Sequence, residues 1–156
     1  MQTQEIEHYL VELGAALESQ GITKPVRMLL IGGAYMMLLA NAPRTTDDVD
    51  IFWMEEGEDF QRAREALRDG AQAIASKYTL PPNWFNYLTQ MLIYDKIKMP
   101  RGKLWKHFGP LQIYAPPTLG GIVFLASVAM HQLYQQGQWR RLERSLPVSF
   151  PSQPSE

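Results

Sequence analysis

The sequence predicts an α/β (α+β) fold in which helices cover a short mixed β-sheet. Amphipathic segments typical of helices alternate with short apolar segments typical of buried strands. Of the 156 residues, 46% are hydrophobic and 20% are charged, which is enough apolar mass for one globular core. We therefore expect a single domain over residues 1–146, followed by a Pro- and Ser-rich tail over 147–156 that we expect to be disordered.

Apolar residues at helical spacing predict two long amphipathic helices, over residues 4–20 and 58–78. A third helix is expected to begin at Trp84, because Pro81-Pro82 interrupts the chain and Asn83 is a suitable N-cap. A fourth, apolar helix is expected from about Leu119 to Tyr134. These segments supply the helical part of the fold.

Three short segments predict the strands of the sheet. Residues 26–31 form an apolar run that ends at Gly32-Gly33, which indicates a buried strand followed by a tight turn. Residues 34–41 are apolar nearly all round and predict a short buried helix that ends at Pro43. The other two strands are expected at residues 49–53 and 111–114.

Composition excludes several classes of protein. The chain has no cysteine, which excludes disulfides and thiolate metal sites. Its longest apolar run is too short to cross a membrane, and its first residues lack the pattern of a signal peptide, so we expect a cytoplasmic protein without a membrane partner. The net charge of −1 means that any attraction to phosphate must be local.

Asp48 and Asp50 are the candidate metal ligands. Side chains alternate along a strand, so these two carboxylates are expected on one face, with Val49 and Ile51 on the other. Like charges this close raise each other's pKa unless a cation or hydrogen-bond donors compensate. Mg²⁺ prefers oxygen ligands and binds through one or two carboxylates plus substrate phosphates. The spacing therefore predicts a magnesium site.

Four nearby residues are candidates for binding a nucleotide or phosphate. Gly32 and Gly33 permit close approach of a ligand to the backbone. Arg44 can hold a phosphate with two parallel hydrogen bonds, and Thr46 can either bind a phosphate or cap the loop that carries the aspartates. Each feature alone is also typical of an ordinary turn or surface loop. Their succession, from strand to glycines to short helix to aspartate pair, is less common.

The segments Ile31-Gly32-Gly33-Ala34 and Arg44-Thr45-Thr46-Asp47-Asp48-Val49-Asp50 resemble the signature of the minimal nucleotidyltransferases, in particular small bacterial proteins related to AbiEii-type toxins. Weaker likenesses occur at residues 82–86 and 108–116. The resemblance implies a nucleotidyltransferase-like fold and Mg²⁺-dependent transfer of a nucleoside monophosphate from a nucleoside triphosphate. It also implies that Asp48 and Asp50 bind Mg²⁺ and act in catalysis, and that Gly32 and Gly33 contact the triphosphate. The acceptor, which could be RNA, a protein or a small molecule, stays open.

Two departures from that signature support an alternative. The family implies a third carboxylate on a neighbouring strand, but the predicted strand at 111–114 offers Gln112, and Asp95 is the only acidic residue between Asp69 and Glu143. Residues 119–130 also lack the charged residues that relatives carry in this helix. The alternative is a nucleotidyltransferase-fold protein that has lost catalysis and serves as a binding or regulatory partner, for instance in a toxin–antitoxin or phage-defence pair. An oligomer is compatible with either hypothesis.

A basic segment provides a further hypothesis. Lys96, Lys98, Arg101, Lys103 and Lys106 lie in one segment together with Tyr94, Trp105 and Phe108. Basic residues combined with aromatic ones are typical of surfaces that bind single-stranded RNA or a nucleotide tail. The alternative is a solvated loop with a few anchoring aromatics. The near-neutral net charge disfavours nucleic-acid binding as the main role.

Overall fold

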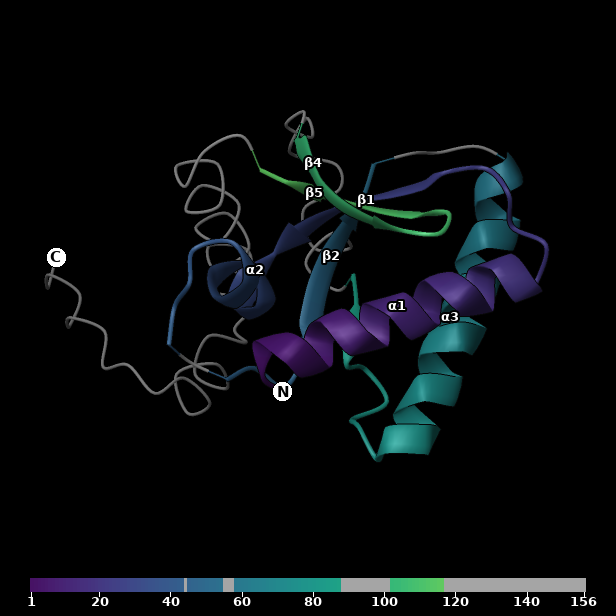
Figure 1. Cartoon of the computed structure of the whole chain (residues 1–156). Coiled ribbons are helices and arrows are strands. Elements are labelled where there is room, and N and C mark those ends of the chain that lie inside the picture. The colour runs from purple at the N-terminus through teal and green to yellow at the C-terminus, as the bar shows by residue number, and fades with distance from the viewer. Residues whose placement is uncertain (44, 55–57, 88–101, 117–156) are drawn as a thin grey trace, which may run out of the picture.

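The computed structural model describes residues 1–43, 45–54, 58–87 and 102–116. This part of the chain contains three helices and a five-stranded mixed sheet (Figure 1). The helices are α1 (Thr3–Ser19), α2 (Gly32–Leu38) and α3 (Glu58–Tyr78), and the strands are β1 (Val26–Ile31), β2 (Val49–Trp53), β3 (Phe85–Asn86), β4 (Lys103–Phe108) and β5 (Leu111–Ala115). The predicted mixed α/β class is confirmed.

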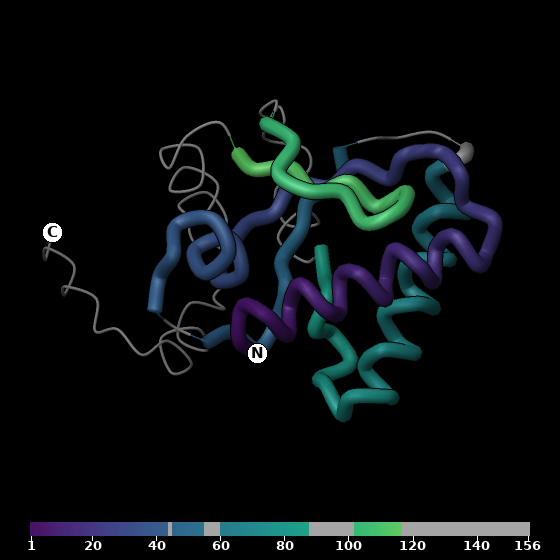
Figure 2. The backbone as a smooth tube through the Cα atoms, in the orientation of Figure 1, coloured from purple at the N-terminus to yellow at the C-terminus, as the bar shows by residue number. Residues whose placement is uncertain are grey.

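The strands lie in the order β3-β2-β1-β5-β4. Strand β1 is antiparallel to β2 and parallel to β5, and β2 is parallel to β3. Strands β4 and β5 form an antiparallel hairpin, drawn in green in Figure 2. This topology brings Ile31 at the end of β1 opposite Asp50 on β2, and Asp50 opposite Asn86 on β3. These three residues therefore lie at the same end of the sheet, where β1 and β3 finish and β2 begins.

Helices α1 and α3 pack against each other and cover one face of the sheet (Figure 1). Alternate residues of the strands point toward them, as the period of two requires. Each of the residues that meet the two helices is buried: Val26, Met28, Leu30, Val49, Ile51, Trp53, Leu111 and Ile113. From the helices, Ile6, Leu10, Leu13 and Leu17 of α1 complete this core at the spacing that the sequence predicts.

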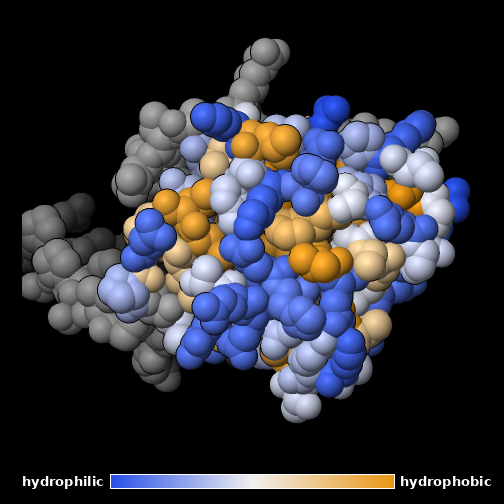
Figure 3. All heavy atoms as spheres, viewed as in Figure 1, coloured by the Kyte–Doolittle hydropathy of each residue, from blue (hydrophilic) through white to orange (hydrophobic). Residues whose placement is uncertain are grey.

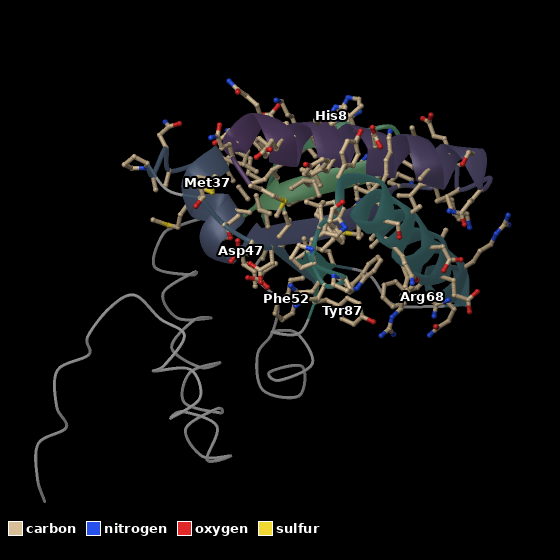
Figure 4. All side chains as sticks on the ribbon, turned by 90° about the horizontal axis from the view of Figure 1, so that it is seen from below. His8, Met37, Asp47, Phe52, Arg68 and Tyr87 are labelled. Atoms are coloured by element: carbon tan, nitrogen blue, oxygen red, sulfur yellow. The ribbon has the colours of Figure 1, made fainter. Side chains whose placement is uncertain are left out.

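The intervening strand residues face the other side of the sheet. Leu29 and Phe52 are register partners and are 0% and 1% exposed, yet they lie outside the core formed by α1 and α3. Figure 4 shows Phe52 on the side of the molecule away from His8 of α1. Asp50 is two residues before Phe52 and shares its face, whereas Val49 and Ile51 join the core. The predicted separation of Asp50 from Val49 and Ile51 is confirmed.

Several predicted bounds agree with the structure and others do not. Strands β1 and β2 and helix α3 span the predicted residues, and α1 is shifted by one residue. Helix α2 begins at Gly32, so the two glycines are its first residues, and it ends at Leu38, well before Pro43. The predicted helix start at Trp84 is wrong, because residues 81–84 form a turn that leads into β3.

Trp84 explains that error. Its side chain is 0% exposed, its indole Nε1 donates to the Ala71 carbonyl at 2.9 Å, and its ring meets Tyr9 in an edge-to-face contact at 5.6 Å. Packing of this large ring against α1 and α3 thus fixes the turn. In addition, the Trp84 carbonyl accepts a hydrogen bond from the Val49 backbone N–H at the start of β2. Local sequence signals do not contain this information.

Strand β4 was not predicted, because residues 96–107 resemble a basic loop in sequence. It pairs with β5 through a register shift between Leu104 and Lys106. The predicted helix at 119–134 and the tail at 147–156 lie outside the described residues. Within the described ranges, no helix has both the length and the apolar character needed to cross a membrane. The face that carries α1 and α3 presents mainly hydrophilic side chains with scattered apolar ones (Figure 3).

Candidate functional site

The central contact of the candidate site joins Asp50 and Gly32. Gly32 has φ +69°, a left-handed conformation that side chains rarely adopt. A Cβ atom built at Gly32 would lie 2.6 Å from Asp50 Oδ2, so only glycine leaves room for the carboxylate. The glycine and aspartate segments, which are separated in sequence, therefore meet at the junction between β1 and α2. Gly33 follows as the second residue of α2 and is half-buried.

Asp48 immediately precedes β2, and Thr46 holds the backbone that leads to it. The Thr46 hydroxyl donates to the Asp48 carbonyl at 3.1 Å and lies 3.4 Å from Asp48 Oδ1. Thr46 is 8% exposed, and its backbone N–H donates to the Met1 carbonyl at 3.3 Å. Of the two roles predicted for Thr46, the structure therefore shows loop capping.

Asn86 is the site residue that sequence reasoning missed. It is 7% exposed, lies opposite Asp50 in the β2–β3 register, and its side chain hydrogen-bonds to the Asp50 carboxylate. Its Nδ2 also donates to the Asn83 carbonyl at 3.1 Å. The sequence resemblance at residues 82–86 includes Asn86, but a short strand of two residues has no periodicity that would have placed it beside Asp50.

The electrostatics of the site are dominated by Asp50. The pKa of this carboxyl is raised from 3.8 to about 6, mainly by burial and also by the negative charge of Asp48, while the hydrogen bond from Asn86 acts in the opposite direction. The surroundings of Asp50 thus disfavour the ionised form of its carboxyl group relative to the protonated form. A bound cation would lower the pKa of Asp50 again, because a nearby positive charge favours the ionised form.

Gln112 does not belong to this site. It pairs with Arg27 at the start of β1, whereas the site lies beyond Ile31 at the other end of that strand. Its Oε1 accepts a hydrogen bond from the Tyr114 hydroxyl at 3.1 Å. The expectation that Gln112 stands where a third carboxylate would be is therefore wrong. The neighbouring strand that faces Asp50 is β3, and it offers Asn86.

The remaining predicted residues are only partly described. Arg44, Asp95, Lys96, Lys98 and Arg101 lie outside the described residues. Lys103 is exposed at the start of β4.

The part of the basic segment that lies in β4 is less accessible to a nucleic acid than the sequence predicts. Lys106 is paired with Glu7 of α1 at 2.6 Å, which neutralises part of its charge. Trp105 and Phe108 pack against the core, so these two rings are not free platforms for stacking bases.

The donor set of the site suits a hard divalent cation. Asp48 and Asp50 supply carboxylate oxygens, and Asn86 supplies an amide beside them. Mg²⁺ binds such oxygen ligands and retains waters or substrate phosphates in its other positions. Among the residues that the structure describes, no group of three or more His, Cys, Asp or Glu side chains is arranged to hold a metal. The described part of the site thus provides two acidic ligands.

Comparison with protein-family models, with curated proteins and with solved structures finds no match to this chain.

Proposed function

We propose that this protein is a Mg²⁺-dependent nucleotidyltransferase, which transfers a nucleoside monophosphate from a nucleoside triphosphate to an acceptor such as RNA, a protein or a small molecule. The contact between the Asp50 carboxylate and Gly32 carries the proposal. It joins a glycine turn, where a phosphate can approach the backbone, to a pair of carboxylates that suits a metal. The resemblance at residues 31–34 and 44–50 supports the same activity.

In this proposal, each residue has a separate task. Asp48 and Asp50 hold the metal, and Gly32 and Gly33 leave room for the triphosphate beside it. Thr46 fixes the Asp48 backbone, and Asn86 orients the Asp50 carboxylate by its hydrogen bond. When bound, the metal neutralises charge on the triphosphate oxygens. The group that deprotonates the acceptor has no candidate among the described residues.

A second candidate function is supported by Asn86. An amide cannot ionise, so it cannot act as a base or as a third acidic ligand, although it lies opposite Asp50 on the neighbouring strand. A protein with this site could bind a nucleotide without turning it over. Such a protein would serve as a binding or regulatory partner, for example in a toxin–antitoxin or phage-defence pair.

Label transfer distinguishes the two candidates. The full chain is incubated with Mg²⁺, each labelled nucleoside triphosphate in turn, and total RNA or total protein. The matched variants are Asp48→Asn and Asp50→Asn, with Asp47→Asn as the control, because Asp47 is exposed and adjacent in sequence.

Transfer by the wild type and by Asp47→Asn, but not by the other two variants, supports the transferase. Nucleotide binding without transfer favours the non-catalytic function. Absence of both binding and transfer would contradict both candidates.

A further inference from the structure

Met1 lies against the loop that carries the aspartates. Its backbone nitrogen donates a hydrogen bond to the Thr46 carbonyl at 2.5 Å, and the Thr46 backbone N–H donates to the Met1 carbonyl at 3.3 Å. Figure 2 shows the start of the tube, marked N, beside the segment that leads into β2. Two residues that are 45 positions apart in sequence are thus joined by a reciprocal pair of backbone hydrogen bonds, as in a hydrogen-bonded pair of an antiparallel sheet.

Met1 is itself held in place by the core and by the first turn of α1. Its side chain is half-buried and packs against the hydrophobic core. The Ile6 backbone N–H donates to the Gln2 carbonyl at 3.0 Å, and the Gln2 backbone N–H donates to Glu5 Oε2 at 2.6 Å. Ile6 is 0% exposed, so this turn is anchored in the core. Met1 therefore has a fixed position from which it can hold the loop.

Thr46 connects Met1 to the candidate metal ligand Asp48. It is buried, whereas Thr45 and Asp47 on either side of it are exposed. Its hydroxyl donates to the Asp48 carbonyl at 3.1 Å and lies 3.4 Å from Asp48 Oδ1. Thr46 thus contacts Met1 through its backbone and Asp48 through its side chain. Outer contacts of this kind orient the carboxylates that bind a metal.

We propose that Met1 is a positioning residue for the metal site, because its two backbone hydrogen bonds hold Thr46, and Thr46 in turn orients Asp48. A loop that is already held in its binding conformation loses less conformational entropy when the metal binds. The role belongs to the backbone at position 1 and needs an N–H group there. The inference rests on the proposed function, since it requires a cation at Asp48 and Asp50.

Two variants that differ in one N–H group test the proposal. Both carry the dipeptide Gly-Ser before position 1, so that the nitrogen at position 1 belongs to a peptide bond. Met1→Ala keeps the N–H that donates to the Thr46 carbonyl, and Met1→Pro lacks it. Thermal unfolding over a series of Mg²⁺ concentrations gives the apparent Mg²⁺ affinity of each folded variant. Met1→Pro should bind Mg²⁺ about two- to tenfold more weakly than Met1→Ala, the effect of one hydrogen bond.

The same pair of variants in a Thr46→Val background separates positioning from a general effect on stability. Valine lacks the hydroxyl that contacts Asp48, so the connection between Met1 and the metal ligand is interrupted. The difference in Mg²⁺ affinity between Met1→Ala and Met1→Pro should then fall below about twofold, because the two sites are coupled. A role in stability alone would lower the free energy of unfolding of Met1→Pro in urea and leave the Mg²⁺ affinity of the folded protein unchanged.

The possible results distinguish failure of this inference from failure of the proposed function. If the wild type with the same dipeptide is not stabilised by Mg²⁺, the metal site is absent, and both fail. If the wild type is stabilised but Met1→Ala and Met1→Pro bind Mg²⁺ equally, only the positioning role of Met1 is overturned. Equal weakening by Met1→Pro with threonine or valine at position 46 would also overturn it, because the Thr46 hydroxyl would not transmit the effect.

Discussion

The Asp50 carboxylate lies so close to Gly32 that any side chain at that glycine would begin 2.6 Å from Asp50 Oδ2. This contact links the end of β1 to the start of β2, and the antiparallel pairing of Ile31 with Asp50 maintains it. The left-handed backbone of Gly32 turns the chain into α2 at the same point. The glycine is thus required both for its conformation and for the space that it leaves.

Replacement of Gly32 by alanine should therefore destabilise the fold and disrupt the site. The positive φ and the contact with Asp50 together should cost about 2–4 kcal/mol in the free energy of unfolding. Urea unfolding measures this loss. Gly33→Ala is the control, because Gly33 is helical without a positive φ, and alanine there should leave stability unchanged or slightly raised. Equal effects of the two substitutions would contradict the account.

The pH dependence of stability should reveal the cost of the Asp50 charge. The folded pKa is about 6, above the unfolded value of 3.8, so the folded protein binds more protons than the unfolded chain between these values. Stability should then fall as the pH rises from about 4 to about 7, by up to about 3 kcal/mol. Asp50→Asn should remove this fall and be more stable than the wild type at neutral pH in the absence of metal.

Urea unfolding from pH 4 to pH 8 without divalent ions measures that difference. Asp47→Asn, at an exposed position, should keep the pH dependence of the wild type. If Asp50→Asn and the wild type show parallel curves over this range, Asp50 is not the buried charge that the structure indicates.

Asn86→Asp should increase the response to Mg²⁺. An aspartate at this 7% exposed position adds a third negative charge beside Asp50, so stability at neutral pH should fall without metal. Added Mg²⁺ should then raise the melting temperature of the variant more than that of the wild type. Thermal unfolding with and without Mg²⁺ measures both effects. The control is Asn83→Asp, because Asn83 is exposed, and a Mg²⁺ response equal in both variants would argue against a metal near Asn86.

Trp84 is expected to stabilise the fold, and with it the turn that leads to Asn86. Trp84→Phe removes the hydrogen bond to the Ala71 carbonyl and part of a fully buried ring. The expected loss is about 2–3 kcal/mol in the free energy of unfolding, measured in urea. Trp105→Phe, at a half-buried position, should cost less than about 1.5 kcal/mol. A loss at Trp84 no larger than at Trp105 would show that the Trp84 anchor is not important for stability.

Local patterns were sufficient to predict much of this fold. Strands β1 and β2 are short apolar runs with a clear boundary, and α3 has a long amphipathic period, so each was predicted with its observed bounds. The position of Asp50 on the face opposite Val49 and Ile51 followed from alternation along β2. These features depend on neighbours in sequence and need no knowledge of the tertiary structure.

The errors concern features that depend on tertiary contacts. Strand β3 contains two residues and is placed by the burial of Trp84, so its sequence carries no periodic signal. The sequence alone suggests Gln112 as the strand residue beside the aspartates, because it does not reveal the order of the strands. The sheet order puts β3 next to β2 and β5 on the far side of β1, which makes Asn86 the neighbour of Asp50.

The most direct test of the central claim is calorimetric titration of the full chain with each nucleoside triphosphate, in the presence and absence of Mg²⁺. The account predicts binding that requires Mg²⁺, that Asp47→Asn retains, and that Asp48→Asn and Asp50→Asn each weaken at least about tenfold, the effect of 1.4 kcal/mol. Failure of every triphosphate to bind, or binding that survives both of the latter substitutions, would contradict it.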